Sequence, residues 1–332
     1  MPHIKECLGS IHAQFWIPEE FELNTNYDAD PYLKIHRLKR TLPYSISRLF
    51  ENLFSEYYFP KVDKLLVLGD FPLHGFPGQV VLVEQLLLVK PEVNPNVSDS
   101  THYRILRYLF RRNIPFAKYL LVQNGEMKSQ LIKSYPELEG KIKIIPLPVP
   151  SWFCYGSKRT NIDLSNGITL FYPAANYPHK NHALFPMMDG TIKKLQFSVK
   201  IVITLDPSEL NADLSELSWV VPVGRLSSEA CLAQYKKSDG LFFPSLLEAY
   251  GLPLVEAMAA EIPIICADLP YARWLCESNA IYFDPFNGES ACKAISDLHK
   301  RLSSFWVVDW TEALKKIPKN WNEVAYRILE LL

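Results

Sequence analysis

The chain has 332 residues, a formal net charge of −1, 48% hydrophobic residues and 21% charged residues. This length predicts two domains rather than one, and the composition is typical of a soluble globular protein. The balanced charge offers no electrostatic argument for nucleic-acid binding, so we expect no nucleic-acid partner.

Cysteine usage and the length of the apolar runs indicate which kinds of site and which location the protein can have. The 6 cysteines are scattered and include no C-x-x-C pair, which argues against a zinc site or a disulfide framework and fits a reducing cytosol. Residues 1–16 lack the apolar core of a signal peptide. The most apolar stretch, residues 80–89, is far shorter than the ~20 residues that span a bilayer. We therefore expect a cytoplasmic protein and leave open its contact with a membrane.

Short apolar runs alternate with helical patterns along most of the chain. The predicted strands of the first half are 64–69, 79–84, 118–123 and 141–146, with helices at 102–112 and 126–134. The predicted strands of the second half are 168–174, 197–205, 218–224, 240–245, 262–268 and 280–285, separated by helical stretches near 180–187, 227–237, 253–260 and 288–302. The runs are rich in Val, Ile and Leu without alternation, as in strands covered on both faces. This order predicts doubly wound parallel sheets, which bind ligands beyond the carboxyl ends of their strands.

The domain boundaries follow from the segment 147–165, whose Pro and Ser content is typical of a linker. It separates a domain of residues 1–150 from a domain of residues 151–305, and we expect residues 306–332 to form a C-terminal helix that packs back on the first domain. The first 60 residues contain no convincing strand and no glycine-rich first turn, although residues 46–58 have a helical pattern. Either the first domain is shortened, or it forms its opening edge, where the strand and the glycine-rich turn are expected, in a different way.

Residues 240–260, GLFFPSLLEAYGLPLVEAMAA, contain the strongest site pattern. A buried strand is followed by a short loop with Glu248, and Gly251 then allows the backbone to approach a ligand closely. Pro253 suits the first turn of a helix, which places Glu256 about one turn into that helix. The free N–H groups and the positive end of the helix suit a diphosphate.

Glu248 and Glu256 stand eight positions apart around this predicted anion site. An ionised carboxylate accepts hydrogen bonds from neighbouring hydroxyl groups, so the pair can hold hydroxyls of a transferred sugar and of a ribose. Taken singly, a glutamate in a loop is usually a solvated charge, and the helix dipole alone favours one in a first turn by about 0.3–1 kcal/mol. The surrounding strand–loop–Gly-Leu-Pro–helix arrangement favours the functional interpretation.

The segment PSLLEAYGLPLVEAMA resembles the E-x₇-E signature of the retaining glycosyltransferases of family 4. The resemblance covers roughly residues 60 to 300 and includes LVLGDFPL (66–73), LLVQNGEMKSQLI (120–132), FYPAANYPHKNHALF (171–185), IPIICADLPYAR (262–273) and AIYFDPFN (280–287). The first two of these look like the O-antigen and polysaccharide branch of the family. The resemblance implies an α/β chain with the GT-B fold, in which two Rossmann-like doubly wound domains face each other across a cleft.

The resemblance also implies roles for individual residues. Glu248 matches the glutamate that contacts the donor sugar, and Glu256 matches the one that binds the ribose. The peptide N–H groups of Tyr250, Gly251 and Leu252 would then meet sugar hydroxyls or phosphate. The donor is thus a nucleoside diphosphate sugar, which is a substrate, and we expect no cofactor.

Lys180, in PHKNH, matches the lysine with which the family neutralises the donor diphosphate. A cation there would stabilise the leaving group, whose charge grows in the transition state. We therefore predict Lys180 and Glu248 as the catalytic residues. No arginine occupies residues 173–179, where a second cation is usual, and Arg225 in VGRLSS is a weaker candidate for substrate binding in the same cleft. We expect no metal, because Lys180 and the helix terminus take its place.

Other positions depart from the family pattern. Glu84 and Gln85 stand where the family often has a histidine near the reacting sugar; Glu84 could accept a sugar hydroxyl or form an ordinary ion pair. Trp274 stands where an acidic residue is frequent. His179 and His182 flank the predicted phosphate-binding lysine and are better explained as packing or helix-start residues than as catalysts.

The preferred function is that of a retaining, metal-independent glycosyltransferase of the hexosyltransferase type. It would transfer a sugar from its nucleotide-sugar donor to a saccharide acceptor, lipid-linked by the resemblance, in polysaccharide biosynthesis. One alternative is a non-catalytic family member that binds a sugar nucleotide or a partner protein. A sugar-nucleotide epimerase is a second alternative, against which the glutamate spacing argues.

Two basic clusters suggest contact with a membrane. The first is Arg104, Arg107, Arg111 and Arg112, which fall along one side of a predicted helix; the second is Lys34, Arg37, Lys39 and Arg40. A basic amphipathic helix can lie on an anionic membrane surface, and a packed helix with a solvated face explains the pattern equally well. We predict peripheral attachment of the first domain to the inner face of the cell membrane.

Overall fold

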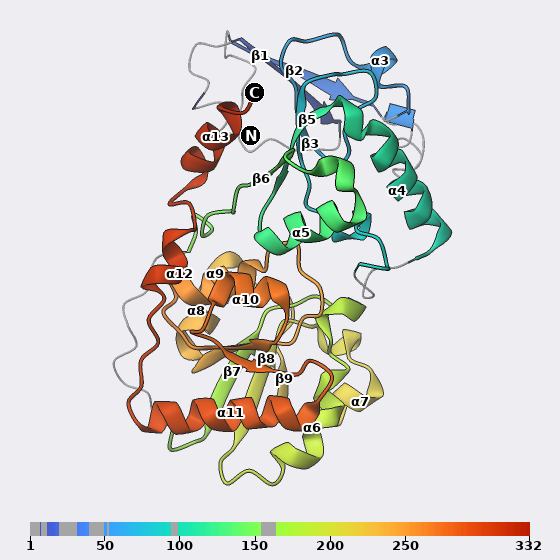
Figure 1. Cartoon of the computed structure of the whole chain (residues 1–332). Helices are drawn as coiled ribbons and strands as arrows, with labels where there is room; N and C mark the ends of the chain where they lie inside the picture. Colours follow the sequence, from blue (N-terminus) through green and yellow to red (C-terminus); the bar gives the residue numbers. More distant parts are fainter. Residues whose placement is uncertain are drawn as a thin grey trace.

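The computed structural model describes residues 12–19, 32–39, 53–93, 99–153 and 164–332, together with Cys7, Phe50 and Glu51. Within them the chain forms two α/β halves, each built on a parallel sheet (Figure 1). The predicted α/β fold with two Rossmann-like halves is confirmed. Part of the predicted linker and Arg40 lie outside the described residues, and the boundaries at residues 150 and 305 stay predictions.

The first sheet follows the predicted strands of the first half. It consists of β3 (Leu66–Leu68), β4 (Gln79–Leu82), β5 (Ala117–Val122) and β6 (Ile142–Ile144), paired in parallel in the order β3-β4-β5-β6. Helix α3 (Ser55–Tyr58) precedes it, and α4 (Thr101–Asn113) and α5 (Gly125–Ser134) lie in its connections. Asn124 caps α5 by accepting a hydrogen bond from the N–H of Met127.

The second sheet carries the predicted site segment. Its strands are β7 (Ile168–Tyr172), β8 (Val199–Ile203), β9 (Val220–Pro222), β10 (Gly240–Phe243), β11 (Ile264–Ala267) and β12 (Ile281–Phe283), all parallel and in the order β12-β11-β10-β7-β8-β9. The helices of this half are α6 (Leu184–Ile192), α7 (Ala212–Ser215), α8 (Ser228–Lys237), α9 (Leu252–Ala259), α10 (Pro270–Cys276) and α11 (Gly288–Ser303).

The direction of winding reverses between β7 and β10. From β7 the chain proceeds outward through β8 to β9, and from β10 it proceeds the other way through β11 to β12. β7 and β10 are direct neighbours, with Leu170 opposite Gly240. The loops after these two strands therefore separate at a topological switch point, where doubly wound sheets bind ligands.

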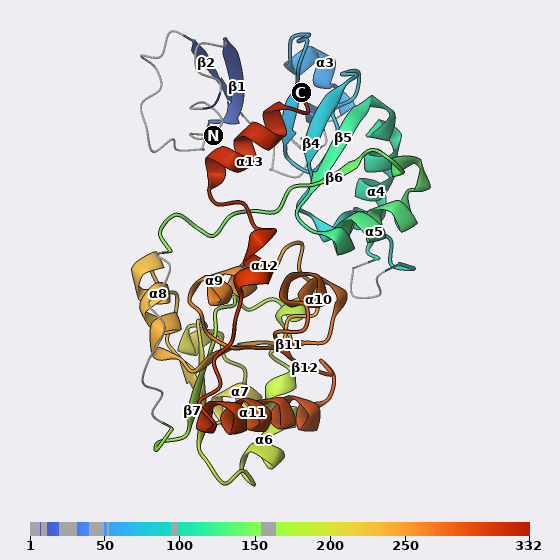
Figure 2. The ribbon, with the colours of Figure 1, turned by 60° about the vertical axis from the view of Figure 1, so that its left-hand side comes forward.

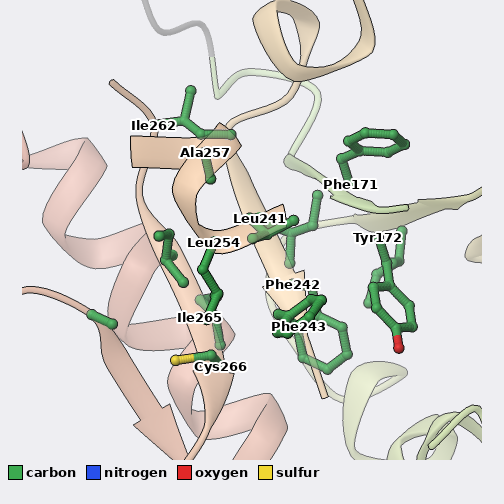
Figure 3. Close-up of a cluster of buried hydrophobic side chains, with 14 of the residues drawn as sticks. Phe171, Tyr172, Leu241, Phe242, Phe243, Leu254, Ala257, Ile262, Ile265 and Cys266 are labelled. Atoms are coloured by element: carbon green, nitrogen blue, oxygen red, sulfur yellow. The ribbon is translucent and has the colours of Figure 1, made fainter. Parts of the chain in front are cut away.

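Large apolar side chains hold the central strands of the second sheet in place (Figure 3). Phe171, Leu241 and Phe242 are fully buried, and the rings of Phe242 and Phe283 stack with centroids 5.3 Å apart. Full burial of a side chain of this size stabilises the fold by roughly 1.5–3 kcal/mol. The loops that follow β7 and β10 thus start from a rigid base.

The expectation that the first 60 residues contain no strand is wrong. β1 (Ala13–Pro18) and β2 (Leu33–Leu38) form a parallel pair separate from the first sheet. Trp16 stacks on His36 with ring centroids 4.9 Å apart, and its ring also meets the edge of Phe59. Of the predicted helix at 46–58, the described residues include α3 at its end. The described part of the first 60 residues therefore contains a small parallel sheet of its own.

The end of the chain returns to the first half. α12 (Thr311–Lys315) lies beside the second half, and α13 (Trp321–Leu329) lies on the first sheet (Figure 2). Val324 and Ile328 of α13 are buried in one cluster with Val80 and Leu121. The first sheet is therefore covered by a helix that follows the second half in sequence.

Candidate active site

Two loops meet at the switch point and are joined through their backbones. The loop after β7 contains a short 3-10 helix, Pro178–Lys180, and the loop after β10 runs from residue 244 to 251. The carbonyl of His179 accepts hydrogen bonds from the N–H of Leu246 at 2.7 Å and from the hydroxyl of Ser245 at 3.2 Å. Residues far apart in sequence are thereby held in a fixed relation.

Asn181 fixes the end of the first loop. Its backbone is left-handed, with φ 58°, a conformation that asparagine tolerates better than most residues. Its side-chain amide donates to the carbonyls of Pro244 at 3.2 Å and Pro285 at 2.8 Å. The hydroxyl of buried Tyr172 donates to the carbonyl of Lys180 at 2.6 Å. The position of the Lys180 backbone is therefore set by three strand ends.

The structure brings Lys180 and Glu248 together. The Nζ atom of Lys180 lies 2.5 Å from Oε1 of Glu248, and the two side chains are 16% and 13% exposed. The ammonium group can neutralise phosphate oxygens, and the carboxylate can accept hydroxyl hydrogen bonds. The two residues predicted as catalytic thus lie side by side, and their chemical roles stay predictions.

Helix α9 begins at the same place. Gly251, its N-cap residue, has φ 93°, and a Cβ atom there would lie 3.2 Å from side-chain atoms of Leu254 and Leu275. The left-handed conformation favours glycine, and a side chain there would also press on these two leucines. Pro253 occupies the first turn, as predicted. The N–H groups of this turn and the positive end of the helix face the region beyond the switch point, where an anion is stabilised.

Glu256 lies deeper than a solvated helix residue would. It is 6% exposed, and its Oε2 accepts a hydrogen bond of 2.8 Å from the hydroxyl of Tyr235 on α8. Burial raises the pKa of Glu256, and the hydrogen bond from Tyr235 acts in the opposite direction. The sequence did not identify Tyr235, because a tyrosine in an apolar helical pattern is ordinarily a core residue.

Tyr250 and Leu252 contribute packing as well as backbone. The Tyr250 hydroxyl donates to the carbonyl of Leu147 at 2.6 Å, which ties the site loop to the segment after β6. Leu252 is partly buried against the core of the second half. Their side chains therefore hold the loop, and only their N–H groups remain candidates for substrate contact.

Arg225 lies apart from the Lys180–Glu248 pair. It is exposed and follows β9, the edge strand, with β8 between β9 and β7. Hydrogen bonds from Ser208 lower the pKa of Asp206, and the positive charge of Arg225 adds a smaller effect. No described hydrogen bond or ion pair connects Arg225 with Lys180 or Glu248, so its predicted role is not supported by a contact.

The two histidines beside Lys180 pack against aromatic rings. His179 stacks on Tyr177 with centroids 5.6 Å apart. His182 is 7% exposed and lies against Tyr172 and Phe185. Burial, with a smaller effect from the charge of Lys180, lowers the pKa of His182 to about 4. His182 is therefore neutral at physiological pH.

Glu84 belongs to the first half and follows β4. Its Oε1 accepts a hydrogen bond of 3.4 Å from the amide of Gln123. Burial and the nearby charge of Asp70 raise the pKa of Glu84. Asn124, the residue after Gln123, donates to the carbonyl of Ala249 at 2.6 Å. Because Ala249 follows Glu248 directly, this contact links the Glu84 environment to the site loop across the two halves.

The predicted basic face of α4 is partly used inside the protein. Arg107 is buried, and its Nε donates to the carbonyls of Leu87 and Val89 at 3.0 Å each. Arg111 pairs with Glu137 at 2.8 Å. The prediction that all four arginines form one basic face for membrane contact is therefore wrong for Arg107, which is buried and holds the fold together.

Across the described ranges, no three His, Cys, Asp or Glu side chains gather in a way that could hold a metal ion. No helix built from those same residues is long and apolar enough to cross a membrane.

Part of the chain matches a known family and known relatives. Residues 218–301 match the family described as Glycosyl transferases group 1. The O-antigen chain mannosyltransferase RfbU of Salmonella typhimurium is 26% identical over 227 residues, which are 65% of this chain and 62% of that protein. The serotype-specific mannosyltransferase WbdA of Escherichia coli is 28% identical over 108 residues, which are 30% of this chain and 13% of that protein. The chain thus spans about three fifths of the first relative and a smaller part of the second.

Solved structures extend the similarity to the whole fold. A sucrose-phosphate synthase from Thermosynechococcus elongatus superimposes with a TM-score of 0.67 at 15% identity, over 99% of this chain and 90% of that one. WaaG, a glycosyltransferase involved in lipopolysaccharide biosynthesis, gives a TM-score of 0.64 at 13% identity, over 99% and 90%. At such identities the likeness shows the fold alone. The chain therefore has the GT-B glycosyltransferase fold, and its segment 218–301, which includes the glutamate pair, resembles the group 1 glycosyl transferases, O-antigen mannosyltransferases among them.

Proposed function

We propose that this protein is a glycosyltransferase that moves a hexosyl group from a nucleoside diphosphate sugar to a saccharide acceptor in O-antigen or related polysaccharide biosynthesis. The observation that carries the proposal is the Lys180–Glu248 pair beside the start of α9. The similarity to RfbU and WbdA, both described as mannosyltransferases, favours a mannosyl group. A neighbour of the same fold, HepE of Anabaena, was solved with UDP and glucose.

Three parts of the site each bind a different part of the donor. Lys180 and the first-turn N–H groups of α9 bind the diphosphate, because a cation and a helix N-terminus both stabilise negative charge. Glu248 accepts hydroxyls of the transferred sugar, and buried Glu256 accepts those of the ribose. The separation of the two glutamates along the loop and α9 fits the order sugar, diphosphate, ribose.

The transfer itself needs charge stabilisation at the leaving group more than a nucleophile from the protein. The bond between the anomeric carbon and the phosphate oxygen breaks, and a bond to the acceptor oxygen forms on the same face of the sugar. The acceptor proton passes to the departing phosphate, which Lys180 stabilises as its charge grows. This course would retain the anomeric configuration and place the protein in family 4. The cation that the leaving group requires comes from Lys180, so the proposal is metal-independent.

The acceptor is proposed to be a lipid-linked saccharide, held by the first half. Peripheral contact with an anionic membrane surface would bring the enzyme to such a substrate. The exposed residues Arg104, Ile105, Tyr108 and Arg112 of α4 form a basic and apolar face suited to that contact.

A donor panel tests the proposed function. The protein is incubated with UDP-, GDP- and ADP-sugars, mannosyl donors first, and with a lipid-linked saccharide acceptor; products are identified by mass spectrometry and the new linkage by NMR. Donor-dependent extension with retained configuration is the expected result. A nucleotide that raises the melting temperature without any transfer would instead support the sugar-nucleotide-binding alternative. Isomerisation of the free donor would indicate an epimerase.

A further inference from the structure

Tyr235 is fully buried and contacts Glu256, the second glutamate of the pair. It lies near the end of α8 and is 0% exposed. Its ring meets Phe153 and Phe171 edge-on, with centroid distances of 5.5 and 5.0 Å. Two aromatic contacts of this kind leave the ring one orientation, so the direction of its hydroxyl group is set by the core.

The Tyr235 hydroxyl engages one of the two carboxylate oxygens of Glu256. It donates to Oε2 at 2.8 Å and lies 3.4 Å from the carbonyl of Pro253. The other oxygen, Oε1, accepts no hydrogen bond from any residue that the structure describes. The carboxylate is thus held at one oxygen and available at the other.

We propose that Tyr235 is a positioning residue that aims Glu256 at the two vicinal hydroxyl groups of the donor's ribose. The inference rests on the proposed function, since it assumes that Glu256 faces a ribose. Tyr235 acts by fixing the rotation of the carboxylate, so that Oε1 keeps one direction. A carboxylate without this contact could turn about its terminal bond, which is a broad torsion.

Electrostatics give Tyr235 a second effect. Burial raises the pKa of Glu256, and the Tyr235 hydrogen bond favours the charged form that accepts hydroxyls. Cys231, one turn earlier on α8, is a second titratable group beside Glu256. Burial and the charge of Glu256 raise the pKa of the Cys231 thiol to about 12, so this thiol stays neutral. Loss of the Tyr235 hydroxyl therefore raises the pKa of Glu256 further. As the pH is lowered, Glu256 then loses its charge, and with it the ribose contact, at a higher pH than in the wild type.

The experiment compares the wild type with Tyr235→Phe, which keeps the ring and removes one hydroxyl. Dissociation constants are measured by calorimetry for UDP, GDP and ADP, and for the 2′,3′-dideoxy form of the tightest of them, at several pH values between 5 and 8. We expect Tyr235→Phe to weaken the ribonucleotide about tenfold, as for loss of one hydrogen bond to a charged group. The weakening grows as the pH falls, and the dideoxy nucleotide binds both proteins equally.

A matched control is Tyr135→Phe. Tyr135 is also buried and donates to a backbone carbonyl, that of Leu88, at 2.7 Å, but it lies in the first half. This variant should bind the ribonucleotide as the wild type does. Equal affinities of wild type and Tyr235→Phe, or equal losses for the ribo and dideoxy forms, would overturn the positioning role. A wild-type protein that binds none of the three nucleotides contradicts the proposed function itself, and the role of Tyr235 with it.

Discussion

Lys180 and Glu248 neutralise each other in the structure, and this pairing has consequences for ligand binding. Their side chains are largely buried, at 16% and 13% exposure, so the attraction at 2.5 Å is only weakly screened by water. A diphosphate that approaches Lys180 competes with Glu248 for the ammonium protons. A sugar attached to that diphosphate compensates, because its hydroxyls give Glu248 new donors. We therefore expect the pair to favour the proposed nucleotide sugar over the bare nucleotide.

Two substitutions separate these effects. Lys180→Met keeps most of the side-chain volume and removes the charge, so nucleoside diphosphate affinity should fall about 10- to 100-fold, as for loss of a charge-assisted hydrogen bond. Glu248→Gln removes the competitor for Lys180, so the bare diphosphate should bind equally well or more tightly, while the nucleotide sugar loses its advantage. Calorimetry with both ligands measures the difference.

Lys193→Met is the matched control for the lysine. Lys193, the C-cap residue of α6, also pairs with a carboxylate, that of Asp189, at 2.5 Å, but its side chain is 67% exposed. Its loss should leave both affinities unchanged. A Glu248→Gln protein that binds diphosphate and nucleotide sugar with the wild-type ratio would contradict the role of Glu248 in sugar binding.

The buried ring of His182 makes stability depend on pH. Its pKa falls from 6.5 to about 4, so the folded state binds this proton less readily than the unfolded state. The free energy of unfolding should therefore fall as the pH falls from about 6.5 to about 4, by at most about 3.5 kcal/mol at 1.4 kcal/mol per pKa unit. Melting temperatures at pH 7 and pH 5 measure the effect. His182→Leu should show a smaller drop, and an equal drop in both proteins would contradict it.

At the scale of elements, strands buried on both faces were predictable and the edges of the fold were not. Runs such as those around β7 and β10 are continuous in apolar residues, so their type follows from composition. β1 and β2 consist of AQFWIP and LKIHRL, where aromatic and charged residues interrupt the apolar pattern. Their pairing is a contact between segments about 20 residues apart, which no local pattern reveals.

The same distinction applies to the site. The strand–loop–glycine–helix pattern predicted Glu248 and Glu256, because each element has local signals. The resemblance predicted Lys180. This residue lies close to Glu248 because β7 and β10, which precede the two loops, are neighbours in the sheet. Tyr235 depends on how α8 packs against α9. That packing is tertiary, so spacing in the sequence carries no sign of it.

The contact between α5 and α10 depends on a glycine. A Cβ atom on Gly125 would lie 2.6 Å from Nε1 of Trp274, so Gly125→Ala must displace the indole. We expect a loss of about 1 kcal/mol, which corresponds to about 2–4 °C in melting temperature. In a Trp274→Leu background the clash is absent, and alanine is the better helix former. The same change should then be neutral or stabilising; an equal loss in both backgrounds would contradict this contact.

The exposed part of α4 is the element to test for membrane binding. Arg104 and Arg112 are exposed, whereas Arg107 is buried and its replacement would disturb the fold. Arg104→Gln with Arg112→Gln should weaken co-sedimentation with anionic vesicles about tenfold or more, at about 1 kcal/mol per basic residue. Lys293→Gln with Lys300→Gln, on exposed positions of α11, is the control. Unchanged binding of the α4 variant would refute attachment through this face.

At the scale of the whole molecule, the loop that carries Glu248 connects the two halves. Asn124 of the first half donates a hydrogen bond to the carbonyl of Ala249 in this loop. Leu247 and Ala249 of the site loop pack against the core of the first half. The loop that carries Glu248 is thus shaped by both halves, and a change in their relative position would move it. The final helix adds a third connection, because α13 follows the second half in sequence and lies on the first sheet.

Ile328 tests how much α13 contributes to the stability of the first half. It is 4% exposed, packs with Val80 and Leu121, and would leave a cavity if shortened. Ile328→Ala should cost about 2–5 kcal/mol, seen as a lower melting temperature and faster proteolysis of the first half. Tyr326→Ala on the same helix is the control, since Tyr326 is 57% exposed and surface changes usually stay within about 0.5 kcal/mol. If α13 were only loosely placed on the first sheet, the two variants would unfold alike.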